Sequence, residues 1–298
     1  MVTNLPWLWA VFTLIAAAAQ TVRNATQREL TAKLGTVGAT HVRFLFGFPF
    51  ALLFLAAIAL VSHAGLPKPG AIFWPWVLDG ALMQIAATAL MLAAMGERSF
   101  VVAIAYVKTE PVQVALFGLI FLGDRVTPGM AAAIVIATAG VVVMSLKTNA
   151  AGGLRPTLLG LAAGGCFALS AIGYRGAILS LAQPDYVMAA TFTVVVGLAL
   201  QSALLTLYLL ARDRAVLVAI FRSWRPSLFA GFMGALASQF WFLAFALATA
   251  ASVRTLALVE VLFAQAIARF VFKQATSLRE ACGIVLIVIG VALLVWAY

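Results

Sequence analysis

Two acidic residues stand within long apolar stretches of this sequence, where a charge needs a reason. Glu110 lies in AYVKTEPVQVALF, residues 105–117, and Glu260 lies in LALVEVLFAQA, residues 256–266. A charged side chain at the centre of a bilayer costs about 3 kcal/mol on insertion scales, so such residues face a partner or a water-filled cavity. A carboxylate there can exchange a proton or accept the ammonium group of a solute. We therefore interpret both as candidate substrate-binding and proton-coupling residues.

Further polar and aromatic side chains accompany these acids. Tyr106, Glu110 and Gln113 follow an i, i+4, i+7 spacing, which places them on one face of a helix. Pro111 removes one backbone hydrogen bond and predicts a hinge at which this helix bends. Amides, hydroxyls and an indole ring also recur in two other apolar stretches, which suits a pocket for an amphipathic solute. The residues predicted to bind substrate there are Gln84, Thr88, Gln239 and Trp241.

A structural role for the two acids is the alternative. Each carboxylate could pair with a buried cation or with backbone groups and thereby lock the helices together. Lys108 lies about 200° around the helix from Glu110, so it is not an obvious partner for that residue. The cations available for pairing are Lys108, Arg175, Arg254 and Arg269. His41 and Arg43 could gate an entrance or anchor a helix at the membrane interface.

The elements that carry these residues are long apolar segments. The chain has 298 residues, of which 65% are hydrophobic and 9% charged, and its mean hydropathy is +1.11. A soluble domain has about 25% charged residues, so this composition predicts an integral membrane protein. A membrane-spanning helix needs about 20 apolar residues. On that basis we predict ten helices, at 5–27, 36–61, 71–95, 99–122, 127–146, 156–180, 186–211, 226–249, 253–272 and 278–297.

The sequence repeats at a constant offset of 150 residues. Under this offset Glu110 corresponds to Glu260, and the further pairs include Pro6 and Pro156, Gly47 and Gly197, Met83 and Met233, and Gly140 and Gly290. We predict two five-helix domains, residues 1–150 and 151–298. An odd number of crossings inverts the second copy, and inverted repeats are typical of transporters that alternate access to a midplane site. The predicted fold is all-α, with ten transmembrane helices in two inverted repeats.

One segment of the first half resembles a known family. PVQVALFGLIFLGDRVTPGMAAAIVIATAGVVVM is similar to the end of the EamA-type repeat of the drug/metabolite transporter superfamily, with a proline-led helix, an LGE-like turn and a late Gly-Val pair. In the second half Val261 replaces the proline, and Lys273-Gln274 replaces the glycine and acid of the turn. The resemblance implies a ten-helix exporter similar to YddG-type amino-acid exporters.

These observations predict a secondary transporter that exports small amphipathic metabolites, with neutral and aromatic amino acids as the substrate class. A proton-coupled antiporter of lipophilic cations is the alternative, because protons and a cation can compete for one carboxylate. A scaffold without transport activity is disfavoured by the inverted repeat. Walker A, HExxH, GxSxG and dinucleotide motifs are absent from the sequence, so we predict neither an enzyme nor an ATP-driven pump, and expect no cofactor or metal.

The net charge of +10 is explained by the positive-inside rule rather than by nucleic-acid binding. Three basic residues, Lys68, Arg125 and Arg254, flank the predicted helices on one side. Twelve flank them on the other side: Arg23, Arg28, Lys33, Arg98, Lys147, Arg155, Arg212, Arg214, Arg222, Arg225, Lys273 and Arg279. The larger group predicts the cytoplasmic side of an inner (plasma) membrane and places both termini outside, whereas the resemblance implies termini inside. The expected partners are the lipid bilayer and a small-molecule substrate, and a monomer suffices.

Overall fold

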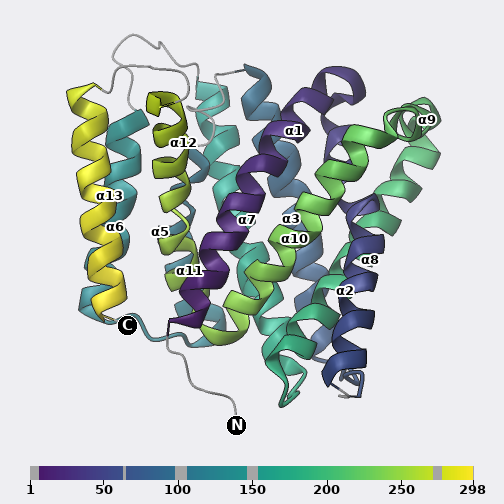
Figure 1. Ribbon diagram of the computed structural model, residues 1–298, viewed down its shortest axis with the longest axis horizontal. Coiled ribbons are helices and arrows are strands. Elements are labelled where there is room, and N and C mark those ends of the chain that lie inside the picture. The colour runs from purple at the N-terminus through teal and green to yellow at the C-terminus, as the bar shows by residue number, and fades with distance from the viewer. Residues whose placement is uncertain (1–6, 63–64, 98–105, 146–153, 271–276, 298) are drawn as a thin grey trace.

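The computed structural model describes residues 7–62, 65–97, 106–145, 154–270 and 277–297, and every regular element within these ranges is helical. The helices form a bundle in which the start of α1 and the end of α13 lie at the same end (Figure 1). Six helical segments in the described ranges are long and apolar enough to cross a membrane. The prediction of an all-α fold is confirmed, while the count of ten helices and the inversion of the repeats stay predictions.

The first half begins with two helices that differ from their predicted limits, α1 (Leu8–Leu45) and α2 (Gly47–Ser62). Gly35 interrupts α1 with φ 66° and ψ 176°, a conformation that glycine reaches without the steric penalty of a side chain. The first part of α1 therefore continues well past the predicted end at residue 27. The half continues with α3 (Phe73–Glu97), α5 (Glu110–Phe117), the π-helical turn η1 (Gly118–Leu122) and α6 (Pro128–Ser145).

The second half contains one helix that the apolar pattern does not predict. Its elements are α7 (Leu154–Ser180), α8 (Tyr186–Arg212), α9 (Arg214–Arg222), α10 (Trp224–Leu247), α11 (Ala250–Leu256), α12 (Val259–Phe270) and α13 (Leu278–Ala297). The short helix α9 buries Leu217 and Ile220 and exposes Arg214 and Arg222. A helix of two and a half turns with basic residues at both ends is too short and too polar for the apolar pattern to predict it as a membrane-spanning helix.

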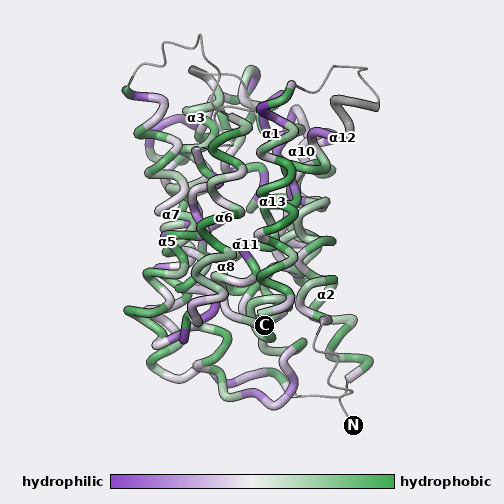
Figure 2. The backbone as a smooth tube through the Cα atoms, turned by 90° about the vertical axis from the view of Figure 1, so that its left-hand side faces the viewer, coloured by the Kyte–Doolittle hydropathy of each residue, from purple (hydrophilic) through white to green (hydrophobic). Residues whose placement is uncertain are grey.

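The outer surface of the bundle is apolar along most of its length. Hydrophobic residues dominate the middle of the helices in Figure 2, and hydrophilic residues are commonest towards the two ends. Large apolar side chains such as Leu53, Ile120, Leu207 and Val288 are exposed on this surface. A band of this kind is suited to lipid tails, which supports the prediction of a multi-pass membrane protein.

Glycine allows several helices to touch along their backbones. Between α6 and α13, a Cβ atom added to Gly290 would lie 2.6 Å from the backbone nitrogen of Ala137. Between α3 and α7, a Cβ atom added to Gly173 would lie 2.6 Å from the backbone nitrogen of Gly80. Small residues at such contacts are typical of helix packing in membranes, where close approach replaces the hydrophobic effect as the main attraction.

This packing predicts that Gly290→Ala lowers the stability of the protein by about 1–3 kcal/mol, because the added methyl group must push α13 away from α6. Thermal unfolding in detergent measures the loss. The matched control is Gly96→Ala, because Gly96 also lies in a helix, α3, but has no atom within 4 Å of an added Cβ. Equal effects of the two substitutions would contradict the proposed backbone contact.

Candidate functional site

Two helices are interrupted next to the two predicted acids. The turn Lys108–Thr109 directly precedes α5, and the turn Ala257–Leu258 separates α11 from α12. The 150-residue offset relates these two interruptions almost residue for residue. Glu110 and Glu260 consequently lie in the first turn of α5 and α12, where the positive end of the helix dipole favours a carboxylate.

Pro111 also lies in the first turn of α5. The backbone N–H groups of a first turn have no acceptor within the helix, so a proline there removes no helical hydrogen bond. The interruption of this helix therefore comes from the Lys108–Thr109 turn, one residue before the acid. Its counterpart in the second half forms without a proline. Motion about Pro111 stays a prediction.

Each of the two acids pairs with a cation from the opposite half of the chain. Nζ of Lys108 lies 2.5 Å from Oε2 of Glu260, and Nε of Arg254 lies 2.9 Å from Oε1 of Glu110. The first contact is also a hydrogen bond, whereas the Nε–H of Arg254 is not aligned with the oxygen and forms an ion pair only. The four side chains are 5–7% exposed. We call these contacts the crossed ion pairs.

An amide and an indole connect the two pairs. Oε1 of Glu260 accepts a hydrogen bond from Nε2 of Gln20 at 3.0 Å, and Oε1 of Gln20 accepts one from Nε1 of Trp241 at 3.1 Å. The guanidinium of Arg254 lies over the Trp241 ring, 4.4 Å from its centroid. A cation in this position is attracted by the negative face of the ring. Gln20 of α1 and Trp241 of α10 thus link the two crossed ion pairs into one network.

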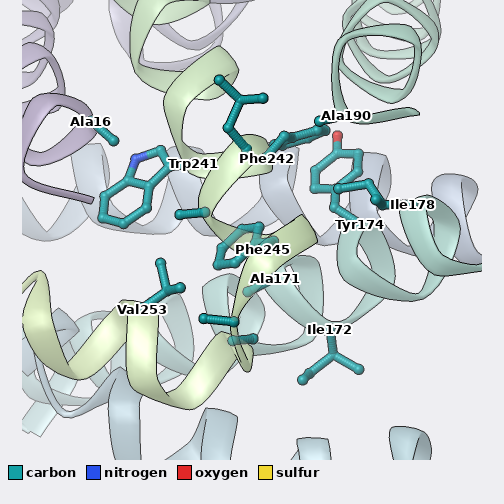
Figure 3. Close-up of a cluster of buried hydrophobic side chains, with 14 of the residues drawn as sticks. Ala16, Ala171, Ile172, Tyr174, Ile178, Ala190, Trp241, Phe242, Phe245 and Val253 are labelled. Carbon is teal, nitrogen blue, oxygen red and sulfur yellow. The ribbon is translucent and has the colours of Figure 1, made fainter. Parts of the chain in front are cut away.

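Aromatic rings of α10 form an apolar wall beside this network (Figure 3). The rings of Trp241 and Phe245 are stacked with their centroids 6.2 Å apart, and Phe242 packs on Tyr174 of α7 at 4.5 Å. We call Trp241, Phe242 and Phe245 the aromatic wall. Its rings are at most 3% exposed, so the charged groups next to it are shielded from solvent.

Arg23 is a functional candidate that the sequence analysis placed elsewhere. The predicted end of the first helix at residue 27 places Arg23 near the cytoplasmic surface, but the side chain is 0% exposed, because α1 continues to Gly35. Nη2 donates a hydrogen bond to Oδ1 of Asn24 at 2.6 Å, while Nε and Nη1 have no partner. The sequence does contain a signal that the first helix continues past residue 27. Gln20, Asn24 and Gln27 follow an i, i+4, i+7 spacing, which places them in one polar stripe along a helix.

Arg43 is a second buried cation without an acidic partner among the described residues. It is 2% exposed, its Nη1 donates to Oγ1 of Thr88 at 3.2 Å, and its Nε has no partner. The stems of Arg23 and Arg43 both pass Gly234 of α10, whose added Cβ would lie 3.4 Å from Cδ of Arg23 and 3.1 Å from Cγ of Arg43. His41 is likewise buried and contacts Thr206. The proposed interface anchor is therefore wrong for both residues.

These placements change the charge count only slightly. Arg23 leaves the group of twelve and Arg254 leaves the group of three, since both are buried, so eleven basic residues stand against two. The sign of the bias is unchanged, and the orientation of the termini stays a prediction.

A small cavity opens between the charged groups. Its lining residues are Gln20, Arg23, Asn24, Met91, Val107, Lys108, Glu110, Phe167 and Arg254. The cavity has room for about one water molecule, so a metabolite enters only when the surrounding helices move apart. Lys108, Glu110, Arg254 and Arg23 therefore border a space that is closed in this conformation.

Four of the other predicted binding residues contact neighbouring helices instead. Oε1 of Gln84 accepts a hydrogen bond from Gln201 at 2.9 Å, and Nε2 of Gln239 donates to Thr191 at 2.7 Å. The side chain of Tyr106 packs against Gly160 of α7, and the side chain of Gln113 packs against Gly165 of the same helix. Of the predicted set, Glu110, Glu260 and Trp241 thus meet in one network, and Thr88 contacts Arg43. A role of all eight in substrate binding stays a prediction.

Arg175, another cation considered for the two acids, serves a different contact. Its Nη1 donates to the backbone oxygens of Phe245 and Ala248, at 2.5 and 2.6 Å, and its Nη2 lies 3.4 Å from Oδ1 of Asp124. It therefore holds the end of α10 against the turn after η1. The side chain of Arg269 lies outside the described residues.

Comparison with known proteins agrees with this arrangement. Residues 7–146 match the EamA-like transporter family, in agreement with the resemblance of the first half. A solved structure titled only "Crystal structure of protein" is 15% identical, covers 97% of this chain and 96% of its own, and superimposes with a TM-score of 0.70. This similarity shows a shared fold. No curated protein matches the chain. The apolar helices indicate a multi-pass membrane protein, while the transport function and the YddG-type likeness stay predictions.

The crossed ion pairs predict a strong coupling between Lys108 and Glu260. Either Lys108→Met or Glu260→Gln should lower the free energy of unfolding by about 3–5 kcal/mol, because each leaves an uncompensated buried charge. The double substitution should cost less than the sum of the two, which a double-mutant cycle of unfolding in detergent measures. The exposed Lys33→Met is the control. Losses that simply add would show that the two side chains do not depend on each other.

Proposed function

We propose that the protein is a secondary transporter that moves small amphipathic metabolites by alternating access around the crossed ion pairs. The observation that carries this proposal is the position of the pairs. They join the interrupted helices of the two halves beside a buried cavity, and their two acids are equivalent under the 150-residue offset. Discontinuous helices that meet near the centre of the membrane are typical of transporter binding sites.

The crossed ion pairs give the two halves a reason to occupy discrete states. If the halves rotate relative to each other, Lys108 and Arg254 either separate from their acids or stay paired, in which case the paired segments move together. A separated pair leaves two charges without compensation inside the protein, which is costly. A solute that supplies hydrogen bonds and charge to the separated groups lowers that cost, and this differential binding is what couples a ligand to a conformational change.

Neutral and aromatic amino acids fit this proposal as substrates, as the resemblance to YddG-type exporters implies. Met91, Val107 and Phe167 supply an apolar lining for a side chain, and the polar groups of the cavity supply donors and acceptors. Export as the direction of transport also follows from the resemblance.

A proton-coupled antiporter of lipophilic cations is the alternative function. Two free carboxylates would suit it, but here both carboxylates already have cationic partners. Arg23 and Arg43 add further positive charge nearby. A lipophilic cation would meet repulsion at this site, so the metabolite transporter is favoured.

The proposal predicts efflux of radiolabelled phenylalanine from reconstituted vesicles, and it predicts that Glu110→Gln reduces this flux about 10- to 100-fold. The reduction is expected because Arg254 loses its charged partner and remains as an uncompensated buried charge. Flux is measured with and without a pH gradient. The control is Glu29→Gln, because Glu29 is an exposed residue of α1.

The outcomes separate the candidate functions. Flux that needs both the gradient and Glu110 would make this acid a proton site, and flux that survives in Glu110→Gln would restrict the acid to a structural role. Movement of a lipophilic cation such as tetraphenylphosphonium, without movement of any amino acid, would establish the alternative.

A further inference from the structure

We infer that Arg23 and Arg43 form an anion-binding subsite, and that the protein recognises the transported solute through a carboxylate group attached to an apolar body. This inference rests on the proposed transport function and names the substrate class for the same cavity. It makes the carboxylate, rather than an ammonium group, the part of the solute that the protein recognises.

The first support is the balance of buried charge. Four cations, Arg23, Arg43, Lys108 and Arg254, lie within one region and are at most 6% exposed. Among the described residues, the acids that act on them are Glu110 and Glu260. The region therefore holds two positive charges more than it can neutralise. A buried cation is retained at such a cost where a ligand or partner compensates it.

The second support is the state of the two arginines. Nε and Nη1 of Arg23 and Nε of Arg43 are buried N–H donors without an acceptor. Arg23 lines the cavity, and its charged neighbours are Arg43, Arg254 and Glu260. Glu260 is already engaged by Lys108 and Gln20. Guanidinium N–H groups form strong, charge-assisted hydrogen bonds with carboxylate oxygens, so a carboxylate is a ligand that suits these unused donors.

The third support is the apolar part of the cavity. Met91, Val107 and Phe167 line it beside Arg23. An inorganic anion such as phosphate would leave these side chains unused, whereas an arylalkanoate would place its carboxylate on the arginines and its ring on the apolar lining. The same reasoning leaves an ammonium group without an unpaired carboxylate to bind, because Glu110 and Glu260 are already paired with Arg254 and Lys108.

Binding of four related compounds tests the subsite. The probes are 3-phenylpropionate, phenylalanine, phenylalaninamide and phenethylamine, and the readout is thermal stabilisation of the purified protein in detergent. We expect 3-phenylpropionate to bind at least as tightly as phenylalanine and the two compounds without a carboxylate to have no effect. Inorganic phosphate is included, and stabilisation by phosphate equal to that by 3-phenylpropionate would contradict the apolar part of the subsite.

Substitution of the arginines tests their role. Arg23→Gln should weaken binding of 3-phenylpropionate about 10- to 100-fold, because it removes charge-assisted hydrogen bonds, and Arg23→Lys should retain part of the affinity. The protein without ligand should remain folded in Arg23→Gln, since the substitution removes an uncompensated charge. The control is Lys33→Gln, an exposed cation of the same helix. Unchanged affinity in both Arg23→Gln and Arg43→Gln would overturn the subsite.

Flux distinguishes failure of the subsite from failure of the proposed function. Phenylalanine flux that is equal in the wild type and in Arg23→Gln would overturn the subsite and leave the transporter standing. Binding of 3-phenylpropionate that depends on Arg23, in a protein that moves no solute across the vesicle membrane, would support the subsite and overturn transport.

Discussion

A charge that is removed from water within a membrane needs an opposite charge or a polar contact, and in this chain the opposite charge comes from the other half. Lys108 reaches Glu260, and Arg254 reaches Glu110. Both contacts form because α5 and α12 begin beside the acids instead of running on as continuous helices. The other features of the site depend on this arrangement: Gln20 bridges Glu260 to Trp241, and Arg254 lies on the aromatic wall.

The surrounding helices make room for this amount of charge. Gly234 of α10 leaves space for the stems of both Arg23 and Arg43, so two guanidinium groups fit where a larger residue would displace them. The cavity beside Arg23 is narrow because the ion pairs hold the helices together. The crossed ion pairs therefore hold the site closed. Arg23 and Arg43 remain without acidic partners beside these pairs, and they give the site its affinity for anions.

Much of the fold follows from hydropathy, whereas the site depends on detail that hydropathy does not carry. The predicted ranges 186–211 and 278–297 agree with α8 and α13 to within one residue, since charged or polar residues bound both runs. The interruption before Glu260 could not be predicted, because LALVEVL contains neither glycine nor proline and tertiary contacts impose the turn. In the first half, Pro111 predicts a bend close to the observed interruption, but the interruption itself lies at Lys108–Thr109 and does not need the proline. Arg23 was misplaced because the end of the first helix was set at residue 27, although Gly35 is the residue that interrupts it.

The crossed ion pairs also bear on how the protein is made. Glu110 is synthesised 144 residues before Arg254, and Lys108 is synthesised 152 residues before Glu260. At about 5–20 residues per second, roughly 7–30 s separates each first-half charge from its partner. During that interval α5 and the residues before it hold an acid and a cation with no counterpart in place. The two charges of the first half therefore gain their counterparts only after residues 254 and 260 have been added to the chain.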